Sequence, residues 1–455
     1  MINSIVSFLK NKKILILGFG REGKSSLNFI NTYLPNADIT IADKNNIDVP
    51  ENPHISTIIG ENYLNSLNEF DIILKSPGIS LKDVSVNKTK ISSQLDLFLK
   101  YSTIKTIGVT GTKGKTTTST LIYNILNAHT KNCFLLGNIG VPVFECLSSI
   151  TSNSIAVIEM SSHQLEFMTH SPNISIITNF YQEHLDHYLS YEHYIDAKLN
   201  IFKYQKKSDW SIFNIDQHEY SSKILNSTCG NTCKISLNNY GNSNLFLDNN
   251  FNIIQNINNK TNKYFCVKDL NKNLIGKHHF YDILFAFAVC NILSIDTHEI
   301  KAILEQFNGI PHRMEYVGKF KNIFFYNDSI ATIPAAVINA VNSLQKVDTL
   351  IIGGMDRGID YTEFIQFLAN SNIGNIICLY ETGKKIANIL NLEYYNLKSK
   401  IYVASDLEDA VNLAFIHTKN DHICLLSPAA ASYGYFKNFE ERGNMFKKYV
   451  LEKGH

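Results

Sequence analysis

The stretch Thr106–Thr120 reads TIGVTGTKGKTTTST and decides the fold of the central part of the chain. Ile107 and Val109 are spaced as in a buried strand, and the apolar positions of Leu121–Leu126 have helical spacing. The glycine loop Gly111–Thr117 lies between them. Backbone N–H groups at such a strand–loop–helix junction favour a bound phosphate. The stretch therefore predicts an α/β sheet with a nucleotide phosphate at its edge.

Two side chains in this loop strengthen that prediction. Lys115 places a positive charge for the β- and γ-phosphates, and the Thr116 hydroxyl is a ligand for Mg²⁺. Only two residues separate Gly111 from Gly114, so the loop is tighter than GxxxxGK[ST]. The alternative is a tight strand-to-helix turn with an incidental Lys-Thr pair.

Composition indicates a globular protein. The chain has 455 residues, which predicts about three domains, and its net charge of +1 gives no reason to expect nucleic acid or an acidic membrane surface. No apolar run reaches the roughly 20 residues that span a bilayer, and the start MINSIVSFLKNKK is not typical of a signal peptide. The 8 cysteines are scattered, which favours reduced thiols in a cytosolic protein.

A second glycine loop, Gly18–Gly23, reads GFGREG and matches GxGxxG. The apolar strand Lys13–Leu17 precedes it, a helix-like run over 25–33 follows, and a second strand ends at Asp43. Taken alone, this fingerprint with its ribose-binding acid predicts an NAD site. The same βαβ geometry binds other nucleotides, so both interpretations stay open. The first domain spans residues 1–103.

Polar side chains follow later strands of the central domain, 104–309. Glu159 comes directly after the strand Ile155–Ile158, where the sheet of a phosphate loop holds its metal. His184 follows the strand Ile174–Thr178, and Lys198 lies on the helix Tyr191–Phe202. We predict that Glu159, His184 and Lys198 converge on one metal pocket, although a single histidine is more commonly a core or surface residue.

The third domain, 310–455, again alternates strands with helices, which predicts a parallel α/β unit. Arginine is rare, and its four positions are Arg21, Arg313, Arg357 and Arg442. Because the planar guanidinium binds carboxylates and phosphates bidentately, these positions point to binding sites. For Arg442 we expect a structural role or a surface ion pair.

In order along the chain, the motifs GTKGKTTT, GNIG, EMSSHQLE, EHLDHY, DAKLNIF, PHRME, NDSIAT and SPAAASYGYFKNFEERG resemble the Mur ligase family. The resemblance covers about 13–443. It implies an ATP-dependent amide ligase of peptidoglycan precursor synthesis, with a Rossmann-like UDP-binding first domain, a central P-loop ATPase-type domain with a parallel sheet, and a Rossmann-like amino-acid-binding third domain. The last motif is most similar to the branch that adds D-glutamate to a UDP-sugar-linked alanine.

The resemblance also implies site residues. ATP would contact Gly111, Thr112, Lys113, Gly114, Lys115, Thr116 and Thr117, with Arg313 and Asp328. The UDP-sugar would contact Gly18, Phe19, Gly20, Arg21, Asp43, Asn138, Ser161 and Gln164, which replaces the NAD interpretation. D-Glutamate would contact Thr332, Arg357, Ser432 and Phe439.

For catalysis, the resemblance implies Lys115, His184 and Lys198. Two Mg²⁺ ions would be held by Thr116, Glu159, His184 and Lys198, the last as a carbamate formed with CO₂. We expect a monomer whose third domain closes on the central one, because ATP contacts are split between Lys115 and Arg313.

Several positions depart from the family pattern. Lys113, His279 and Asp282 stand where asparagine is common, and Ile330 and Arg357 stand where lysine is common. The resemblance implies that the residue at the position of Asp282 contacts the adenine of ATP, so this departure concerns how adenine is bound. Three alternatives follow: a related ligase with another amino acid or a folate acceptor, an NAD-dependent oxidoreductase built on GFGREG, and a relative that binds UDP-sugar without turnover.

Overall fold

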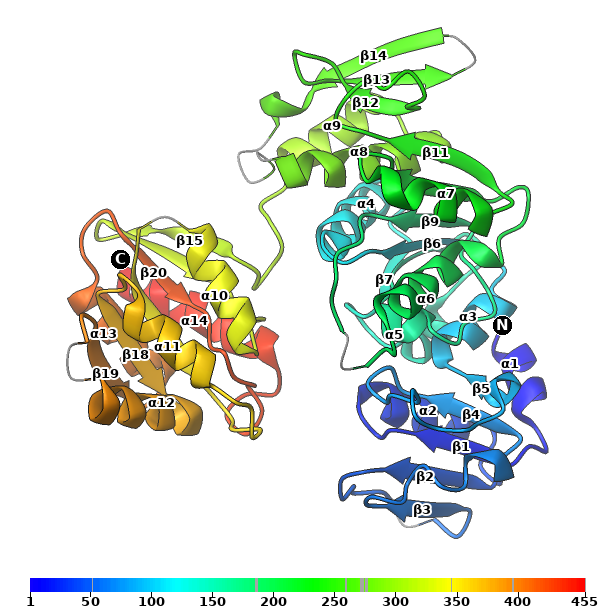
Figure 1. Cartoon of the computed structure of the whole chain (residues 1–455), viewed down its shortest axis with the longest axis horizontal. Coiled ribbons are helices and arrows are strands. Elements are labelled where there is room, and N and C mark those ends of the chain that lie inside the picture. The colour runs from blue at the N-terminus through cyan, green and yellow to red at the C-terminus, as the bar shows by residue number, and fades with distance from the viewer. Residues whose placement is uncertain are drawn as a thin grey trace. The chain divides into compact units, whose positions relative to one another are not determined.

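The computed structural model describes residues 1–50, 52–184, 187–257, 260–270, 274, 277–344, 346–394 and 397–454. The chain forms two compact units, Met1–Phe307 and Asn308–His455 (Figure 1). The first unit holds two sheets and the second unit holds one. Each of the predicted ranges 1–103, 104–309 and 310–455 contains one of these sheets.

The first sheet has five parallel strands in the order β3-β2-β1-β4-β5. Its strands are β1 Ile14–Leu17, β2 Ile39–Asp43, β3 Ile55–Ile59, β4 Ile72–Lys75 and β5 Ile91–Ser92, and its helices are α1 Ile2–Leu9, α2 Arg21–Tyr33 and α3 Gln94–Tyr101, with short 3-10 turns η1 Leu67–Glu69 and η2 Lys88–Lys90. Every residue of β1 is buried. Helix α2 starts four residues before the predicted Ser25, because Gly20 is extended and caps the helix directly after the glycine loop.

The second sheet has nine strands in the order β14-β13-β12-β11-β10-β9-β6-β8-β7. They are β6 Lys105–Thr110, β7 Cys133–Gly137, β8 Ile155–Glu159, β9 Ile174–Ile177, β10 Trp210–Asn214, β11 Asn231–Ile235, β12 Leu245–Leu247, β13 Asn252–Ile257 and β14 Lys260–Cys266. Its helices are α4 Lys115–Thr130, α5 Ser162–Leu165, α6 Tyr191–Lys203, α7 His218–Ser227, α8 Lys277–Ile292 and α9 Thr297–Glu305, with η3 Val143–Ser149 and η4 Val267–Asp269.

This sheet is parallel from β7 to β12, but β12, β13 and β14 pair antiparallel. The expected parallel sheet therefore carries a mixed edge. A parallel pair needs a long crossover connection, and the short links among β12, β13 and β14 provide none.

One hydrophobic core joins the first two sheets. It contains Ile16 and Phe29 from the first sheet's layer and Phe144 and Ile158 from the second. The rings of Phe29 and Phe144 lie 4.4 Å apart, within the range of a favourable aromatic contact. The core thereby fixes the two nucleotide-type loops of unit 1 relative to each other.

The third sheet has six strands in the order β15-β16-β20-β17-β18-β19. They are β15 Glu315–Phe320, β16 Ile323–Asn327, β17 Val347–Gly353, β18 Asn375–Leu379, β19 Lys400–Ala404 and β20 Ile423–Leu426, and the helices are α10 Pro334–Ser343, α11 Thr362–Asn370, α12 Tyr380–Glu393, α13 Leu407–His417 and α14 Phe439–Gly454. Only β15 runs antiparallel to its neighbour.

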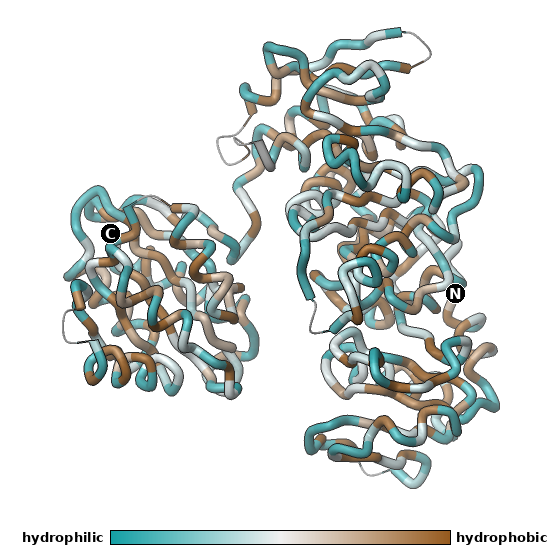
Figure 2. The backbone as a smooth tube through the Cα atoms, in the orientation of Figure 1, coloured by the Kyte–Doolittle hydropathy of each residue, from teal (hydrophilic) through white to brown (hydrophobic). Residues whose placement is uncertain are grey.

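Two hydrophobic clusters lie in unit 2, and both contain residues of β16, β17, β18 and β20. Successive side chains of a strand point to opposite faces of the sheet, so the clusters cover its two faces. Figure 2 shows hydrophobic residues gathered along the strands of each sheet. No helix in the described part of the chain combines the length and apolarity that a bilayer crossing requires.

Candidate active site

The phosphate loop joins β6 to α4, as predicted from its glycines. Gly111 has φ +142° and Gly114, which caps α4, has φ +87°, and L side chains rarely adopt such values. A Cβ on Gly111 would also collide with Thr178 Oγ1. The loop therefore depends on both glycines to fold tightly against the end of β9.

Residues just after β9 hold the loop in place. Thr178 Oγ1 and Asn179 Nδ2 both donate to the Lys113 carbonyl, at 2.6 and 2.9 Å. Asn179 Oδ1 accepts the Lys113 N–H at 2.9 Å, and the Asn179 carbonyl accepts the Thr112 N–H at 3.0 Å. The loop backbone is thus fixed before any ligand binds.

Two lysines converge on the Gly111 carbonyl. Lys115 Nζ donates to it at 3.0 Å and to the Thr112 carbonyl at 2.8 Å, and Lys198 Nζ donates to Gly111 at 2.8 Å. Lys198 is only 2% exposed. Burial, and then the charge of Lys115, lower the pKa of Lys198 well below its usual value, while Glu183 opposes the shift. The neutral amine of Lys198 is therefore favoured beside the loop.

Tyr194 packs Lys198 against the loop, and the sequence did not single it out. Lys198 Nζ lies 4.6 Å from the Tyr194 ring centroid, and the Tyr194 hydroxyl shares a hydrogen bond of 2.9 Å with Thr112 Oγ1. Tyr194 precedes Lys198 by one helical turn on α6, so the two side chains share a face. That i,i+4 spacing is the signal by which Tyr194 could have been found.

Glu159 ends β8, and its backbone pairs with Val109 of β6. The carboxylate is 1% exposed, and Asn138 Nδ2 donates to its Oε1 at 2.7 Å. Its other oxygen, Oε2, is buried and has no hydrogen-bond partner among the residues that the structure describes. A buried carboxylate oxygen without a donor costs free energy, so this oxygen fits a cation such as Mg²⁺.

His184 is one of three neighbouring histidines, with His163 and His187. The His163 ring lies 4.7 Å from that of His184 and 4.1 Å from that of His187, and His187 Nε2 lies 3.0 Å from Glu166 Oε2. Burial, with the neighbouring histidines, lowers the pKa of His163 to about 3. The described residues contain no group of three His, Cys, Asp or Glu side chains placed to hold a metal. Glu159 ends the strand next to the loop, Lys198 of α6 donates to the loop carbonyl of Gly111, and the His184 ring lies 6.1 Å from that of Tyr194.

A cavity of about 550 Å³ opens at the carboxyl edge of the first sheet. Six of the eight residues predicted for the UDP-sugar line it: Gly18, Gly20, Arg21, Asp43, Asn138 and Gln164. A larger cavity, about 860 Å³, lies at the opposite edge beside Lys10, Asp38 and His54. Ligands of open parallel sheets bind at the carboxyl edge, and the glycine loop opens there.

The two remaining predicted residues support this cavity. The Phe19 N–H donates to Asp43 Oδ2 at 2.7 Å, and Ser161 caps α5 by accepting the Gln164 N–H. The cavity also contains Glu22, which the sequence analysis did not propose. Gln164 Nε2 donates to Glu22 Oε1 at 2.9 Å, and burial raises the pKa of the Glu22 carboxyl.

In unit 2, Asp328 comes directly after β16 and is buried. It accepts the Ser427 hydroxyl at 2.8 Å and the Met314 N–H at 3.2 Å. Burial raises its pKa to about 6, although these hydrogen bonds and the charge of Arg313 lower it. Arg313, on the loop before β15, is exposed.

The residues predicted for the amino acid lie on loops that are bonded to one another. The Ala429 N–H donates to the Ala331 carbonyl and the Met355 N–H to the Ala431 carbonyl, both at 2.9 Å. These bonds connect the loops that carry Thr332, Arg357 and Ser432, and Phe439 begins α14. Ser432 is buried, Thr332 is half-buried, and Arg357 is exposed.

Arg442 is a structural residue, not a surface ion pair. It is 1% exposed and donates to Ser329 Oγ at 3.0 Å, the Ser329 carbonyl at 2.8 Å and the Ala430 carbonyl at 3.0 Å. Burial lowers its pKa to about 10, which leaves it charged. Arg442 therefore ties together two of the loops that carry predicted ligand residues.

Asp282 packs beneath the phosphate loop. It accepts the Thr118 hydroxyl at 2.8 Å, and His279 Nδ1 lies 3.3 Å away. A Cβ on Gly114 would lie 2.9 Å from Asp282 Oδ1. Burial raises the pKa of Asp282. The residue that departs from the family pattern thus supports the start of α4.

Comparisons with known proteins agree with this geometry. Residues 109–290 match the Mur ligase middle domain, and residues 312–430 match the Mur ligase, glutamate ligase domain. UDP-N-acetylmuramoylalanine--D-glutamate ligase of Clostridium botulinum (strain Okra / Type B1) is 33% identical to the chain over 459 residues, which cover 97% of each protein.

Two solved structures share the fold. UDP-N-acetylmuramate-alanine ligase MurC of Thermotoga maritima has a TM-score of 0.54 at 18% identity, covering 97% of this chain and 100% of that one. MurF ligase of the same organism, in complex with ADP, has a TM-score of 0.52 at 16% identity, covering 98% and 97%.

The chain belongs to the Mur ligase family. It is an ATP-dependent amide ligase of peptidoglycan synthesis, which excludes the oxidoreductase alternative.

Proposed function

We propose that the protein adds D-glutamate to UDP-N-acetylmuramoyl-L-alanine, using ATP. One observation carries the proposal: Asn138 lines the UDP-type cavity, and its amide donates to Glu159 beside the phosphate loop. A nucleotide-sugar held in that cavity would therefore extend toward the γ-phosphate of ATP. The choice of D-glutamate is supported by the relative named for that reaction, which is 33% identical over nearly the whole chain.

The chemistry is the activation of a carboxylate. The L-alanyl carboxylate attacks the γ-phosphorus, the bond to the bridging oxygen breaks, and ADP leaves. The resulting acyl phosphate is attacked at its carbonyl carbon by the amine of D-glutamate, which loses a proton, and inorganic phosphate leaves as the amide forms. Lys115 and the N–H groups at the start of α4 neutralise charge on the transferring phosphoryl group.

Magnesium fits the residues at this site. Thr116, Glu159, His184 and Lys198 would hold it, and bound Mg²⁺ would neutralise phosphoryl oxygens as a Lewis acid. The unpartnered Glu159 oxygen supports this assignment. Lys198 would contribute as a carbamate, because its lowered pKa supplies the neutral amine that adds to CO₂ with release of a proton.

The amino-acid site is proposed on the connected loops of unit 2. Ser432 and Phe439 would shape it, Thr332 would add a hydroxyl, and Arg357 would bind a glutamate carboxylate in its planar fork. Arg313 and Asp328 would contact ATP. The enzyme is proposed to work as a monomer in the cytoplasm, where ATP and nucleotide-sugars are found.

An ADP-release assay with single omissions tests the proposal. ADP should form only when ATP, UDP-N-acetylmuramoyl-L-alanine and D-glutamate are all present, and L-glutamate, L-alanine and glycine should each give at most a few per cent of that rate. Equal or faster ADP release with another amino acid would contradict the D-glutamate assignment. Release that needs neither the sugar nor an amino acid would contradict amide ligation.

A further inference from the structure

The loop that carries Arg313 has an unusual backbone. His312 and Met314, on either side of Arg313, have φ values of +62° and +47°. Both values lie in the left-handed region, which is costly for residues other than glycine. A loop of this kind persists only where the surrounding structure holds it. We therefore expect contacts around residues 312–314 that stabilise this backbone.

Backbone bonds fix the loop on both sides of Arg313. The His312 carbonyl accepts the Ile330 N–H at 3.1 Å, the Arg313 N–H donates to the Ile310 carbonyl at 3.2 Å, and the Met314 N–H donates to Asp328 Oδ1 at 3.2 Å. The Arg313 guanidinium is exposed and forms no hydrogen bond or ion pair within the described residues. The main chain is thus held while the side chain stays available to a ligand.

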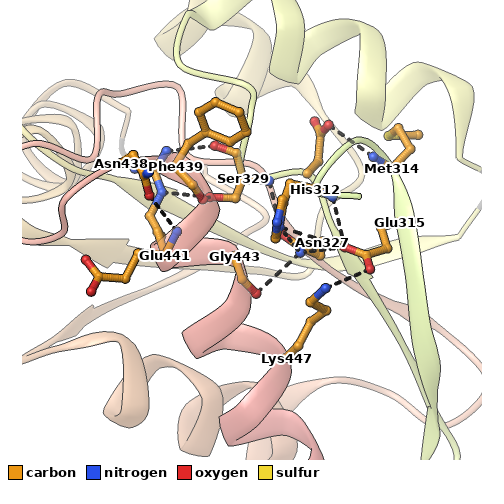
Figure 3. Close-up of polar contacts among 12 residues, drawn as sticks. His312, Met314, Glu315, Asn327, Ser329, Asn438, Phe439, Glu441, Gly443 and Lys447 are labelled. Atoms are coloured by element: carbon orange, nitrogen blue, oxygen red, sulfur yellow. Dashed lines mark hydrogen bonds and ion pairs between the residues drawn. The ribbon is translucent and has the colours of Figure 1, made fainter. Parts of the chain in front are cut away.

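A side-chain network centred on the buried Asn327 lies behind the loop (Figure 3). Asn327 is 0% exposed, and its Nδ2 donates to Glu315 Oε2 at 2.9 Å and to His312 Nδ1 at 3.0 Å. Glu315 Oε2 also accepts the His312 N–H at 2.9 Å, and Glu315 Oε1 accepts from Lys447 Nζ of α14 at 2.9 Å. Asn327 and Glu315 contact His312 directly, and Lys447 in turn holds Glu315.

The His312 ring is held in one state and one place. An amide nitrogen can only donate, so His312 Nδ1 is the acceptor and Nε2 carries the proton. Burial, and then the charge of Lys447, lower the pKa of His312, which agrees with a neutral ring. A Cβ on Gly443 of α14 would collide with His312 Nδ1, so α14 approaches the ring as closely as its backbone allows.

We propose that Asn327 and His312 are positioning residues, which hold the strained loop 312–314 so that Arg313 is presented to the triphosphate of ATP. This inference rests on the proposed function, in which Arg313 contacts ATP. Neither residue touches the nucleotide; both act through the Arg313 backbone. The network holds the strained loop in one conformation in the folded protein, so that the loop loses little further conformational freedom when ATP binds.

A matched pair of asparagine variants of the full chain separates positioning from stability. Asn375 begins β18, is 6% exposed, and donates to Asp348 Oδ2, Thr349 Oγ1 and the His417 carbonyl. It lies at the amino end of its strand, opposite the edge where Asn327 ends β16. Asn327→Ala and Asn375→Ala should lower the melting temperature by comparable amounts.

Only Asn327→Ala should weaken affinity for a non-hydrolysable ATP analogue, by roughly tenfold in calorimetric titration. In an Arg313→Ala background, Asn327→Ala should add less than about twofold, because its effect passes through Arg313. Unchanged affinity in Asn327→Ala, an equal loss in Asn375→Ala, or an undiminished effect without Arg313 would each overturn the proposal.

Two His312 variants test the proposal without removing Asn327. Asparagine tolerates the left-handed region and can place an acceptor near the position of Nδ1, so His312→Asn should keep nucleotide affinity within about threefold. His312→Ala should lose roughly tenfold. Equal affinities in the two variants would contradict the role given to His312. Analogue binding needs no amino acid, so a wild-type enzyme that fails to use D-glutamate would refute the proposed function and leave this result interpretable.

Discussion

Two glycine loops of unit 1 occupy the same place in their sheets but differ in backbone conformation and in surroundings. Gly18–Gly23 follows β1 and opens onto α2, and Gly111–Gly114 follows β6 and opens onto α4. Gly18, after β1, has φ +87°, whereas Gly111, after β6, has φ +142°, and of the two helix caps Gly20 is extended while Gly114 has φ +87°. Each loop follows a buried parallel strand and precedes a helix N-terminus, so by backbone alone each favours a phosphate.

The difference lies in the side chains that neighbouring strands and helices place around each loop. Around the first loop, Asp43 accepts the Phe19 N–H, and Glu22 accepts from Gln164. Around the second loop, Lys115 Nζ and Lys198 Nζ both donate to the Gly111 carbonyl. One buried carboxylate oxygen of Glu159 has no hydrogen-bond partner within the described part of the chain. In the proposed function, the first loop holds the nucleotide of the UDP-sugar and the second loop places charges around the reacting phosphate. The side chains around each loop, more than its glycines, therefore indicate which function the loop has.

The largest expected effect is at the second loop. Lys115→Ala should lower the rate of ADP release by about 10²–10³-fold, because the group that neutralises the transferring phosphoryl is lost. Lys131→Ala, at the exposed C-terminal end of α4, is the control and should stay within about twofold of wild type. A decrease of less than about fivefold in the ADP-release rate of Lys115→Ala would contradict the catalytic role that distinguishes the second loop from the first.

The next effect concerns Lys198. Burial lowers the pKa of Lys198, which shifts it toward the neutral amine that a carbamate requires, and we expect a carbamate at this position. Lys198→Arg, which cannot form a stable carbamate, should lose about 10²-fold in activity, and the ¹³C carbamate signal seen in wild type with labelled bicarbonate should disappear. Lys203→Arg, exposed on the same helix, should keep both. A carbamate signal that survives Lys198→Arg would assign the modification elsewhere.

Variants in the first loop should affect one substrate only. Arg21→Ala removes a side chain that lines the cavity and donates to the Gly140 carbonyl, so KM for the UDP-sugar should rise about tenfold. KM for ATP should change by less than about twofold, as measured by steady-state kinetics. A parallel rise in both KM values would show that the two loops do not serve separate substrates.

The smallest expected change is one of stability, at the strand-end carboxylate Asp328 of unit 2. Its folded pKa, about 6, lies above the unfolded value near 3.8, so wild type loses stability as pH rises through this window. Asparagine can keep both hydrogen bonds without the charge. Asp328→Asn should therefore melt a few degrees above wild type at pH 7.5, and the difference should vanish by about pH 4. A melting temperature of Asp328→Asn below that of wild type at pH 7.5 would contradict this prediction, because it would show that neighbouring groups stabilise the charged Asp328 carboxylate.

Much of this organisation could be predicted from the sequence, because glycine loops after apolar strands impose strong local signals. The strands around Gly18–Gly23 and Gly111–Gly114 lie within a residue or two of the predicted positions. The antiparallel edge β12–β14 could not be assigned to this sheet from the sequence, since residues 226–273 are rich in asparagine and have weak periodicity. Strand pairing there depends on contacts far along the chain.

Side-chain partners were harder to predict than strands. Tyr194 carries no motif, and only its spacing from Lys198 connects it with the site. Arg442 looked equally suited to an ion pair, but a fully buried guanidinium on backbone oxygens follows only from how the loops of unit 2 meet. Asp282 differs from the family pattern, and the contact with Gly114 that explains its place depends on packing between α8 and the loop.

Isotope transfer tests the central claim, which is that the second loop activates a carboxylate as an acyl phosphate. The L-alanyl carboxylate of UDP-N-acetylmuramoyl-L-alanine would be labelled with ¹⁸O and turned over with ATP and D-glutamate, and the phosphate analysed by mass spectrometry. We predict one ¹⁸O atom in each phosphate released. Unlabelled phosphate, or AMP and pyrophosphate as products, would contradict the account.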